Sequence, residues 1–151
     1  QALPGGTEHI VYVDDDPSLA EIGTGLLQGF GYRVSALNDS LEALRFLLEH
    51  RETVDLVITD LTMPNMTGLD LARRLQEEQI RIPVILCTGY SEGLTPEQLA
   101  RSGIKKCLHK PVNMHVLAPA VRAVQDACRQ PAGGGDVDAP NLDTEPDRAR
   151  L

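Results

Sequence analysis

Short apolar runs alternate along the chain with longer segments in which apolar residues recur at helical spacing. Four of the five runs end at a polar residue or a turn, which is typical of buried strands. The runs cover residues 10–13, 32–36, 56–60, 82–87 and 105–109, and the helical segments cover residues 17–30, 39–48, 68–77, 95–103 and 113–128. This alternation predicts an α/β fold with a doubly wound, five-stranded parallel sheet, five helices and three layers.

The helical segments carry start signals and expected buried faces. Asp16 before Pro17 and Thr95 three residues before Gln98 are typical N-terminal caps. Pro119 lies inside the last helical segment and predicts a kink there, or a helix that starts near Ala118. Spacing predicts that the first helix buries Leu19, Ile22, Leu26, Leu27 and Phe30, and that the second buries Leu41, Leu44, Leu47 and Leu48.

The composition divides the chain into three parts. We expect a linker at residues 1–8, one domain at residues 9–129, and a flexible, acidic, Pro/Gly-rich tail at residues 130–151. The net charge of −8 argues against nucleic acid as a direct partner. We expect no signal peptide, and no apolar stretch approaches the roughly 20 residues of a membrane span. The three cysteines have no metal-ligand spacing and predict small buried residues in a reducing compartment, so we expect a cytoplasmic segment without membrane contact.

Carboxylates gather where two of the expected strands end. Asp14, Asp15 and Asp16 follow the first run, and Asp60 closes the third. Carboxyl ends of parallel strands meet at one edge of a sheet, where ligands bind in open α/β folds. Two carboxylates 4 Å apart repel by roughly 4 kcal/mol at an effective dielectric of 20. A divalent cation would relieve this repulsion, and oxygen ligands suit Mg²⁺.

The remaining strand ends add a hydroxyl and an ammonium to the same edge. Thr88 follows the fourth run and Lys110 follows the fifth. Carboxylates, a hydroxyl and an ammonium together suit Mg²⁺-assisted handling of a phosphoryl group, because that chemistry needs positioning and neutralised charge.

Four motifs, in this order, resemble the receiver domains of two-component signalling proteins across residues 9–128. They are Val13-Asp14-Asp15-Asp16-Pro17, the segment from Ile58 to Gly68, Cys87-Thr88-Gly89 and His109-Lys110-Pro111. The resemblance implies a flavodoxin-like strand order, 2-1-3-4-5. It also implies a phospho-accepting module in a phosphorelay, with a histidine kinase or a histidine phosphotransfer domain as partner.

The resemblance also implies roles for the acidic residues. Asp60 would be the phosphoacceptor and would take the phosphoryl group from a partner's phosphohistidine. Asp15 and Asp60, with the backbone carbonyl of Thr62, would hold Mg²⁺, and Asp14 would assist through water.

Thr88 and Lys110 would contact the phosphoryl group, Thr88 through a hydrogen bond and Lys110 through its charge. Receivers usually carry an aromatic residue three positions before the lysine, where this chain has Cys107. The change of aromatic rotamer by which receivers usually respond to phosphorylation is therefore in question for this chain. Tyr90 and Thr62 occupy positions that tune dephosphorylation in this family.

Two other functions compete with the receiver interpretation. A Mg²⁺-dependent phosphatase with an Asp nucleophile would carry two acids separated by one residue after the first strand. The nucleophile candidate in this chain lies on the third strand instead. A degenerate receiver that serves only as a binding platform would not need Asp15, Asp60, Thr88 and Lys110 together. A receiver by itself catalyses only its own aspartyl phosphorylation and dephosphorylation.

The wider context has two interpretations. The motifs around Asp60 and Thr88 are similar to those of receivers at the C-terminus of hybrid sensor histidine kinases, which would make the parent chain a kinase. A stand-alone single-domain response regulator is the alternative, and a weak homodimer is left open.

Overall fold

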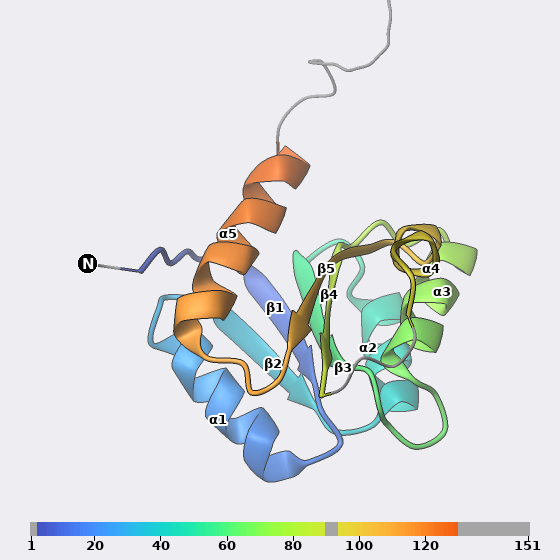
Figure 1. Ribbon diagram of the computed structural model, residues 1–151, viewed down its shortest axis with the longest axis horizontal. Coiled ribbons are helices and arrows are strands. Elements are labelled where there is room, and N and C mark those ends of the chain that lie inside the picture. The colour runs from blue at the N-terminus through green and yellow to red at the C-terminus, as the bar shows by residue number, and fades with distance from the viewer. Residues whose placement is uncertain (1–2, 90–93, 130–151) are drawn as a thin grey trace, which may run out of the picture.

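The computed structural model describes residues 3–89 and 94–129, and it shows five strands that alternate with five helices (Figure 1). The strands are β1 (His9–Val13), β2 (Arg33–Leu37), β3 (Leu56–Asp60), β4 (Val84–Thr88) and β5 (Ile104–His109). The helices are α1 (Pro17–Gln28), α2 (Ser40–Glu49), α3 (Gly68–Glu77), α4 (Pro96–Arg101) and α5 (Met114–Arg129).

The strands form one parallel sheet in the order β2-β1-β3-β4-β5. This confirms the predicted flavodoxin-like topology. Val13 lies opposite Thr59 and Asp60 lies opposite Cys87, so the carboxyl ends of the central strands are level. The residues that follow these strands are therefore brought to one edge.

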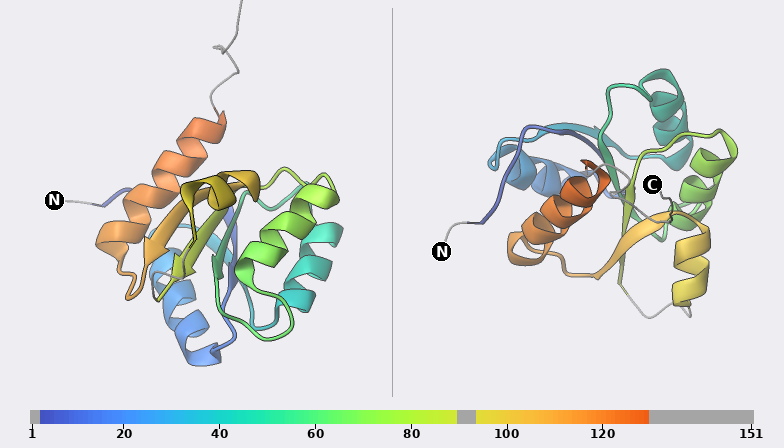
Figure 2. Two further views of the ribbon diagram at one scale, coloured as in Figure 1. Left: turned by 45° about the vertical axis from the view of Figure 1, so that its right-hand side comes forward. Right: turned by 90° about the horizontal axis from the view of Figure 1, so that it is seen from above.

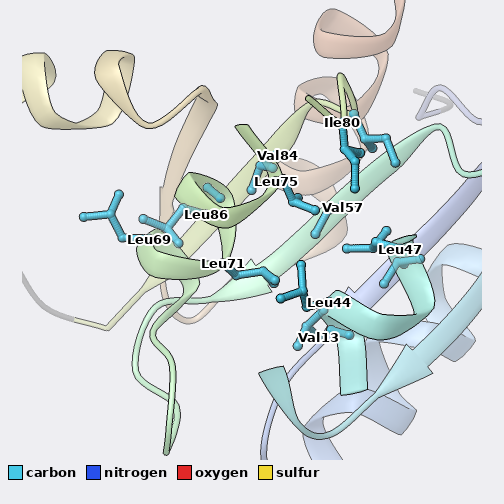
Figure 3. Close-up of a cluster of buried hydrophobic side chains, with 14 of the residues drawn as sticks. Val13, Leu44, Leu47, Val57, Leu69, Leu71, Leu75, Ile80, Val84 and Leu86 are labelled. Carbon is cyan, nitrogen blue, oxygen red and sulfur yellow. The ribbon is translucent and has the colours of Figure 1, made fainter. Parts of the chain in front are cut away.

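Helices cover both faces of the sheet, as the alternating pattern predicts (Figures 1 and 2). Side chains that alternate along each strand supply two separate cores. Val13 and Val57 join the core beneath α2 and α3 (Figure 3), and Ile58 and Ile85 join the core beneath α1 and α5. None of the helices in the described part of the chain is long and apolar enough to cross a membrane.

Helix ends follow the predicted chemistry. The Asp16 carboxylate accepts the backbone N–H of Ser18 and caps α1, with Pro17 in the first helical position. Thr95 and Gln98 form a reciprocal capping box at α4. Gly103 follows α4 with a φ of 76°, a left-handed conformation that glycine adopts without strain.

The buried face of α1 is not the one that apolar spacing predicts. Leu27 is buried as expected, but the exposed fractions of Leu19, Ile22 and Leu26 are 45%, 60% and 44%. Ala20 and Gly23 occupy the buried positions instead. Small residues allow the helix to approach the sheet closely, so the large apolar side chains flank the contact. In α2, Leu44 and Leu47 are buried as predicted, but Leu41 is 45% exposed.

Helix α5 is continuous through Pro119. It begins at Met114, so the predicted start near Ala118 is wrong. The Asn113 side chain accepts the backbone N–H of Val116 and caps this start. Pro119 lies on the exposed side of the helix. Proline has no N–H to donate to the carbonyl four residues earlier, and on this side water can reach that carbonyl instead.

Residues 3–8, assigned to the linker by composition, lie against the domain. Leu3 packs on the core beneath α1 and α5. The Gly6 N–H donates to the Phe30 carbonyl at 3.1 Å, and Glu8 is only 4% exposed. Gly31, with a φ of 101°, lets the Gly6 carbonyl approach the turn after α1. The predicted tail at 130–151 is outside the described residues.

Candidate functional site

Three carboxylates meet at the carboxyl ends of β1 and β3. One oxygen from each of Asp14, Asp15 and Asp60 lies within 4.8 Å of the others. Asp14 is buried, Asp60 is partly buried and Asp15 is exposed. The sheet therefore brings together the acidic residues that the sequence predicts.

Asp14 is fixed by its neighbours. Its Oδ1 accepts the Asp16 backbone N–H at 3.0 Å, and its own backbone N–H donates to the Leu37 carbonyl at 3.1 Å. Burial is the largest cause that raises the pKa of Asp14, and the charges of Asp60 and Asp15 add to it. The Asp16 N–H and Lys110 only partly oppose this rise in pKa. The carboxylate is thus held in an environment that disfavours its charge.

Lys110 is the cation of the cluster. Its Nζ lies 3.0 Å from Asp60 Oδ1 and 3.8 Å from Asp14 Oδ2. Its backbone N–H donates to the Thr88 carbonyl at 2.8 Å, which ties the residue after β5 to the end of β4. Burial lowers the pKa of Lys110, but the hydrogen bond to Asp60 and the charges of Asp60 and Asp14 outweigh it and raise the pKa.

The loop after β3 depends on a glycine beside the acidic cluster. The Gly68 N–H donates to the Leu61 carbonyl at 2.9 Å, so the loop returns to the end of β3. A Cβ at Gly68 would collide with the backbone carbonyl of Asp60. Only glycine can begin α3 this close to Asp60, which links the start of that helix to the site.

The other predicted site residues lie at the same edge. Thr88 is the last residue of β4 and is 3% exposed. Thr62 lies two residues beyond Asp60 in the β3–α3 loop and is exposed, and its carbonyl as a metal ligand stays a prediction. Tyr90 is outside the described residues. The structure thus brings Asp14, Asp15, Asp60 and Lys110 into one cluster.

The donor set of this cluster fits a hard divalent cation. The cluster holds three carboxylates and one ammonium group, a formal excess of two negative charges. All of its donors are oxygens, which Mg²⁺ and Ca²⁺ prefer and which Zn²⁺ and Cu⁺ sites seldom use alone. One face of the cluster is open through the exposed Asp15, so an ion and its waters have access.

A hollow of about 430 Å³ adjoins the cluster between α1 and the start of α5, and we call it the α1/α5 hollow. Asp60 and Lys110 belong to its lining, together with Tyr12, Ile58 and Cys87. Sequence reasoning did not assign Tyr12 or Cys87 to the site. The alternation of side chains along a strand could have identified Tyr12, because it lies two residues before Asp14 and points to the same face.

Neither Tyr12 nor Cys87 is ionised near neutral pH. Burial, with the charges of Cys87, Asp14 and Asp60 added, raises the pKa of Tyr12 to about 12. Burial is also the main reason that the pKa of the Cys87 thiol is raised to about 12. The thiol beside Asp60 is therefore not a ready nucleophile, since the thiolate is the reactive form. Asp60 is the better candidate for covalent chemistry.

The remaining cysteines differ in burial from the prediction. Cys87 is buried, but Cys107 is only partly buried and Cys128 is exposed. Cys107 packs against the core beneath α2 and α3 and stands opposite Leu86 in the sheet.

The match to known proteins agrees with this geometry. Residues 10–122 match the family model described as "Response regulator receiver domain". The chain is 38% identical over 130 residues to the transcriptional regulatory protein GlrR of Escherichia coli, covering 85% of this chain and 28% of GlrR. It is 30% identical over 121 residues to the sensor histidine kinase RcsC of Salmonella typhimurium, covering 80% of this chain and 13% of RcsC.

Solved structures share the fold. A response regulator receiver domain protein from Clostridium thermocellum superposes with a TM-score of 0.76 at 27% identity, over 81% of this chain and 97% of that one. The response regulator TrrA from Thermotoga maritima, solved in complex with Mg²⁺-BeF, gives a TM-score of 0.70 at 27% identity, over 78% of this chain and 99% of that one. The acidic edge of the sheet, the strand order and these similarities lead to one assignment: this chain belongs to the response regulator receiver domain family.

Proposed function

We propose that Asp60 accepts a phosphoryl group from a phosphohistidine on a histidine kinase or a histidine phosphotransfer domain, with Mg²⁺ at the acidic cluster. The observation that carries this proposal is the meeting of Asp14, Asp15 and Asp60 within 4.8 Å, with the Lys110 ammonium 3.0 Å from Asp60. Membership of the receiver family supports it.

The residues of the chain divide the reaction between them. A carboxylate oxygen of Asp60 attacks phosphorus, the N–P bond of the donor breaks, and its electron pair stays on the imidazole nitrogen. Lys110 neutralises part of the charge on the transferred group, and Thr88 donates a hydrogen bond to one of its oxygens. Such transfer depends mostly on positioning and electrostatic stabilisation, which a rigid strand edge supplies.

Asp14, Asp15 and Asp60, with the Thr62 carbonyl, would hold the metal ion. When bound, Mg²⁺ offsets the negative charge of the carboxylates and of the phosphoryl oxygens. The Mg²⁺-BeF complex of TrrA supports this assignment by analogy. The excess of carboxylate over ammonium charge in this cluster supports it from the chain's own residues.

The exposed apolar stripe of α1 is a docking surface for the donor. Leu19, Ile22 and Leu26 are each more than 40% exposed and all three line the α1/α5 hollow, which Asp60 also lines. A partner whose histidine reaches Asp60 would cover this stripe. Burial of this apolar surface would favour the complex, offset by the entropy lost on association.

The parent protein is proposed to be a hybrid sensor histidine kinase, and a stand-alone response regulator is the alternative. Both a sensor kinase and transcriptional regulators are similar to this chain, which spans only 13% of RcsC and 28% of GlrR. A role in phosphorelay signalling in the cytoplasm fits either context.

Intact-mass spectrometry after incubation with acetyl phosphate and Mg²⁺ tests the phosphoacceptor role. We expect an addition of about 80 Da, one phosphoryl group per chain. Asp60→Asn should abolish it, whereas Asp16→Asn should not, because asparagine also caps α1. Labelling elsewhere, or turnover of many phosphoester molecules per chain, would favour the phosphatase, and no addition from any donor would favour a binding platform.

A further inference from the structure

Tyr12 lies directly behind the charged cluster. It precedes Asp14 by two residues on β1, and its strand neighbour Ile58 precedes Asp60 by two residues on β3. Side chains two apart on a strand share a face. Tyr12 and Ile58 therefore form the floor of the α1/α5 hollow beneath Asp14, Asp60 and Lys110.

The position of the Tyr12 ring depends on Gly23 of α1. A Cβ at residue 23 would lie 2.5 Å from Tyr12 Cζ, 2.7 Å from its Oη and 2.9 Å from its Cε2. Real Cβ contacts are never this short, so any other residue would displace the ring. Glycine is a poor helix former, yet it occupies the buried side of α1 at this point. The missing side chain makes room for the phenol ring.

We propose that Tyr12 is a positioning residue for the phosphorylated state: its ring occupies part of the α1/α5 hollow beneath the Lys110–Asp60 pair and keeps water out of that part. The proposal rests on Asp60 being the phosphoacceptor. Ion pairs are stronger where water is excluded, so the ring strengthens the hold of Lys110 on the phosphoryl group. Gly23 acts through Tyr12, because it sets where the ring lies.

The step that Tyr12 slows is hydrolysis of the aspartyl phosphate. A water oxygen attacks phosphorus, the bond from phosphorus to the Asp60 oxygen breaks, and its electron pair returns to the carboxylate while the water's proton passes to solvent. A filled floor admits fewer water molecules near phosphorus and keeps Lys110 in place. Loss of the ring should shorten the phosphoryl lifetime.

The test measures the half-life of the phosphoryl group after acetyl phosphate is removed by desalting, with intact mass as the readout. Tyr12→Phe keeps the ring and should stay within about twofold of wild type, whereas Tyr12→Leu should shorten the half-life by about fivefold. Gly23→Ala should shorten it by about two- to threefold. Gly25→Ala is the matched control, because no atom lies within 4 Å of a Cβ there, and it should change nothing.

A double-mutant cycle separates this role from general packing. In a Tyr12→Leu background the methyl group of Gly23→Ala meets no ring, so the second change should have no further effect on the half-life. Circular dichroism melting identifies any variant that fails to fold, and Tyr12→Phe then carries the comparison with Gly23→Ala.

Two results would overturn the proposal while leaving the phosphoacceptor role intact. They are a folded Tyr12→Leu protein with the wild-type half-life, and a Gly23→Ala effect that persists in full without the ring. If wild-type protein takes no phosphoryl group at all, the proposed function fails first and the role of Tyr12 fails with it.

Discussion

Two clusters of acids and bases lie on the α1/α5 side of the molecule, and they are built differently. At the carboxyl edge of the sheet, Lys110 lies beside Asp60 and Asp14, and Asp15 is grouped with these two acids. On α5, Arg122 binds both oxygens of Glu8 at 2.9 and 3.0 Å and also Asp126 at 2.8 Å.

The Arg122 cluster is saturated. Besides the two carboxylates, Nη1 of Arg122 donates to the Tyr32 hydroxyl at 3.4 Å, and the side chains of Arg122 and Glu8 are 17% and 3% exposed. Hydrogen bonds to Glu8 and Asp126 raise the pKa of Arg122. The fork of the guanidinium matches the carboxylate in a fixed geometry, so this pair holds residues 3–8 against α5.

The Lys110 cluster is left short of positive charge. One flexible ammonium group serves three carboxylates, and Asp14 has a raised pKa as a result of burial and of its acidic neighbours. The Arg122 cluster also has two carboxylates for one cation, so the geometry of pairing separates the two roles more than the count of charges does. The bidentate cluster stabilises the fold, whereas the Lys110 cluster, with the larger excess of carboxylates, is ready for a cation and a phosphoryl group.

Breaking the saturated cluster should have the largest effect on stability. Glu8→Ala leaves the partly buried Arg122 guanidinium without its bidentate partner, and the loss of one member of a buried pair costs about 3 kcal/mol. Urea unfolding measures it. Glu97→Ala is the control, because its ion pair with Arg101 is as short, at 2.7 Å, but exposed, and should cost less than about 1 kcal/mol. Equal effects of the two changes would contradict the assignment of Arg122 as a structural anchor.

Changing the cation of the other cluster should affect chemistry rather than folding. Lys110→Gln removes the charge that faces the phosphoryl group, and we expect the rate of labelling by acetyl phosphate to fall by about a hundredfold. The free energy of unfolding should change by less than about 1 kcal/mol, since the acids lose one shared partner at an open site. Lys106→Gln, at an exposed position of β5, should keep the wild-type rate. A normal rate in Lys110→Gln would remove Lys110 from the site.

Mg²⁺ should stabilise the protein through the Lys110 cluster. At ten times its dissociation constant, a ligand that binds only the folded state adds about 1.4 kcal/mol to the free energy of unfolding. Thermal melting with and without Mg²⁺ measures this. Glu8→Ala should retain the full increment and Asp15→Asn should lose most of it. An increment that survives Asp15→Asn would place the ion elsewhere.

The smallest expected effect is on the stability of the metal-free protein when Asp14 is replaced. Because its pKa is raised in the folded protein, its charge destabilises the fold above that pKa. Asp14→Asn keeps an acceptor for the Asp16 N–H and should raise stability by about 1 kcal/mol near neutral pH. The difference should shrink as pH falls towards about 4, where Asp14 becomes protonated in both states. Chemical denaturation at several pH values checks the sign, and a lower stability of Asp14→Asn at neutral pH would contradict it.

The order of the elements and the location of the site could be predicted from local patterns. Strand ends such as Asp60 and Lys110 are marked by short apolar runs, and parallel topology brings those ends together. The face of α1 could not be predicted, because Ala20 and Gly23 pack where a periodicity argument expects large apolar residues. Glu8 and Arg122 are 114 residues apart, and no local pattern pairs them. The contact between Tyr12 and Gly23 depends on how closely α1 approaches the sheet.

Peptide mapping of the phosphorylated protein shows directly which residue carries the phosphoryl group. After reaction with acetyl phosphate, we expect the added 80 Da, the approximate mass of one phosphoryl group, on the peptide that contains Asp60, and only when Mg²⁺ is present. The same mass on another residue, or equal labelling without a divalent cation, would contradict the account.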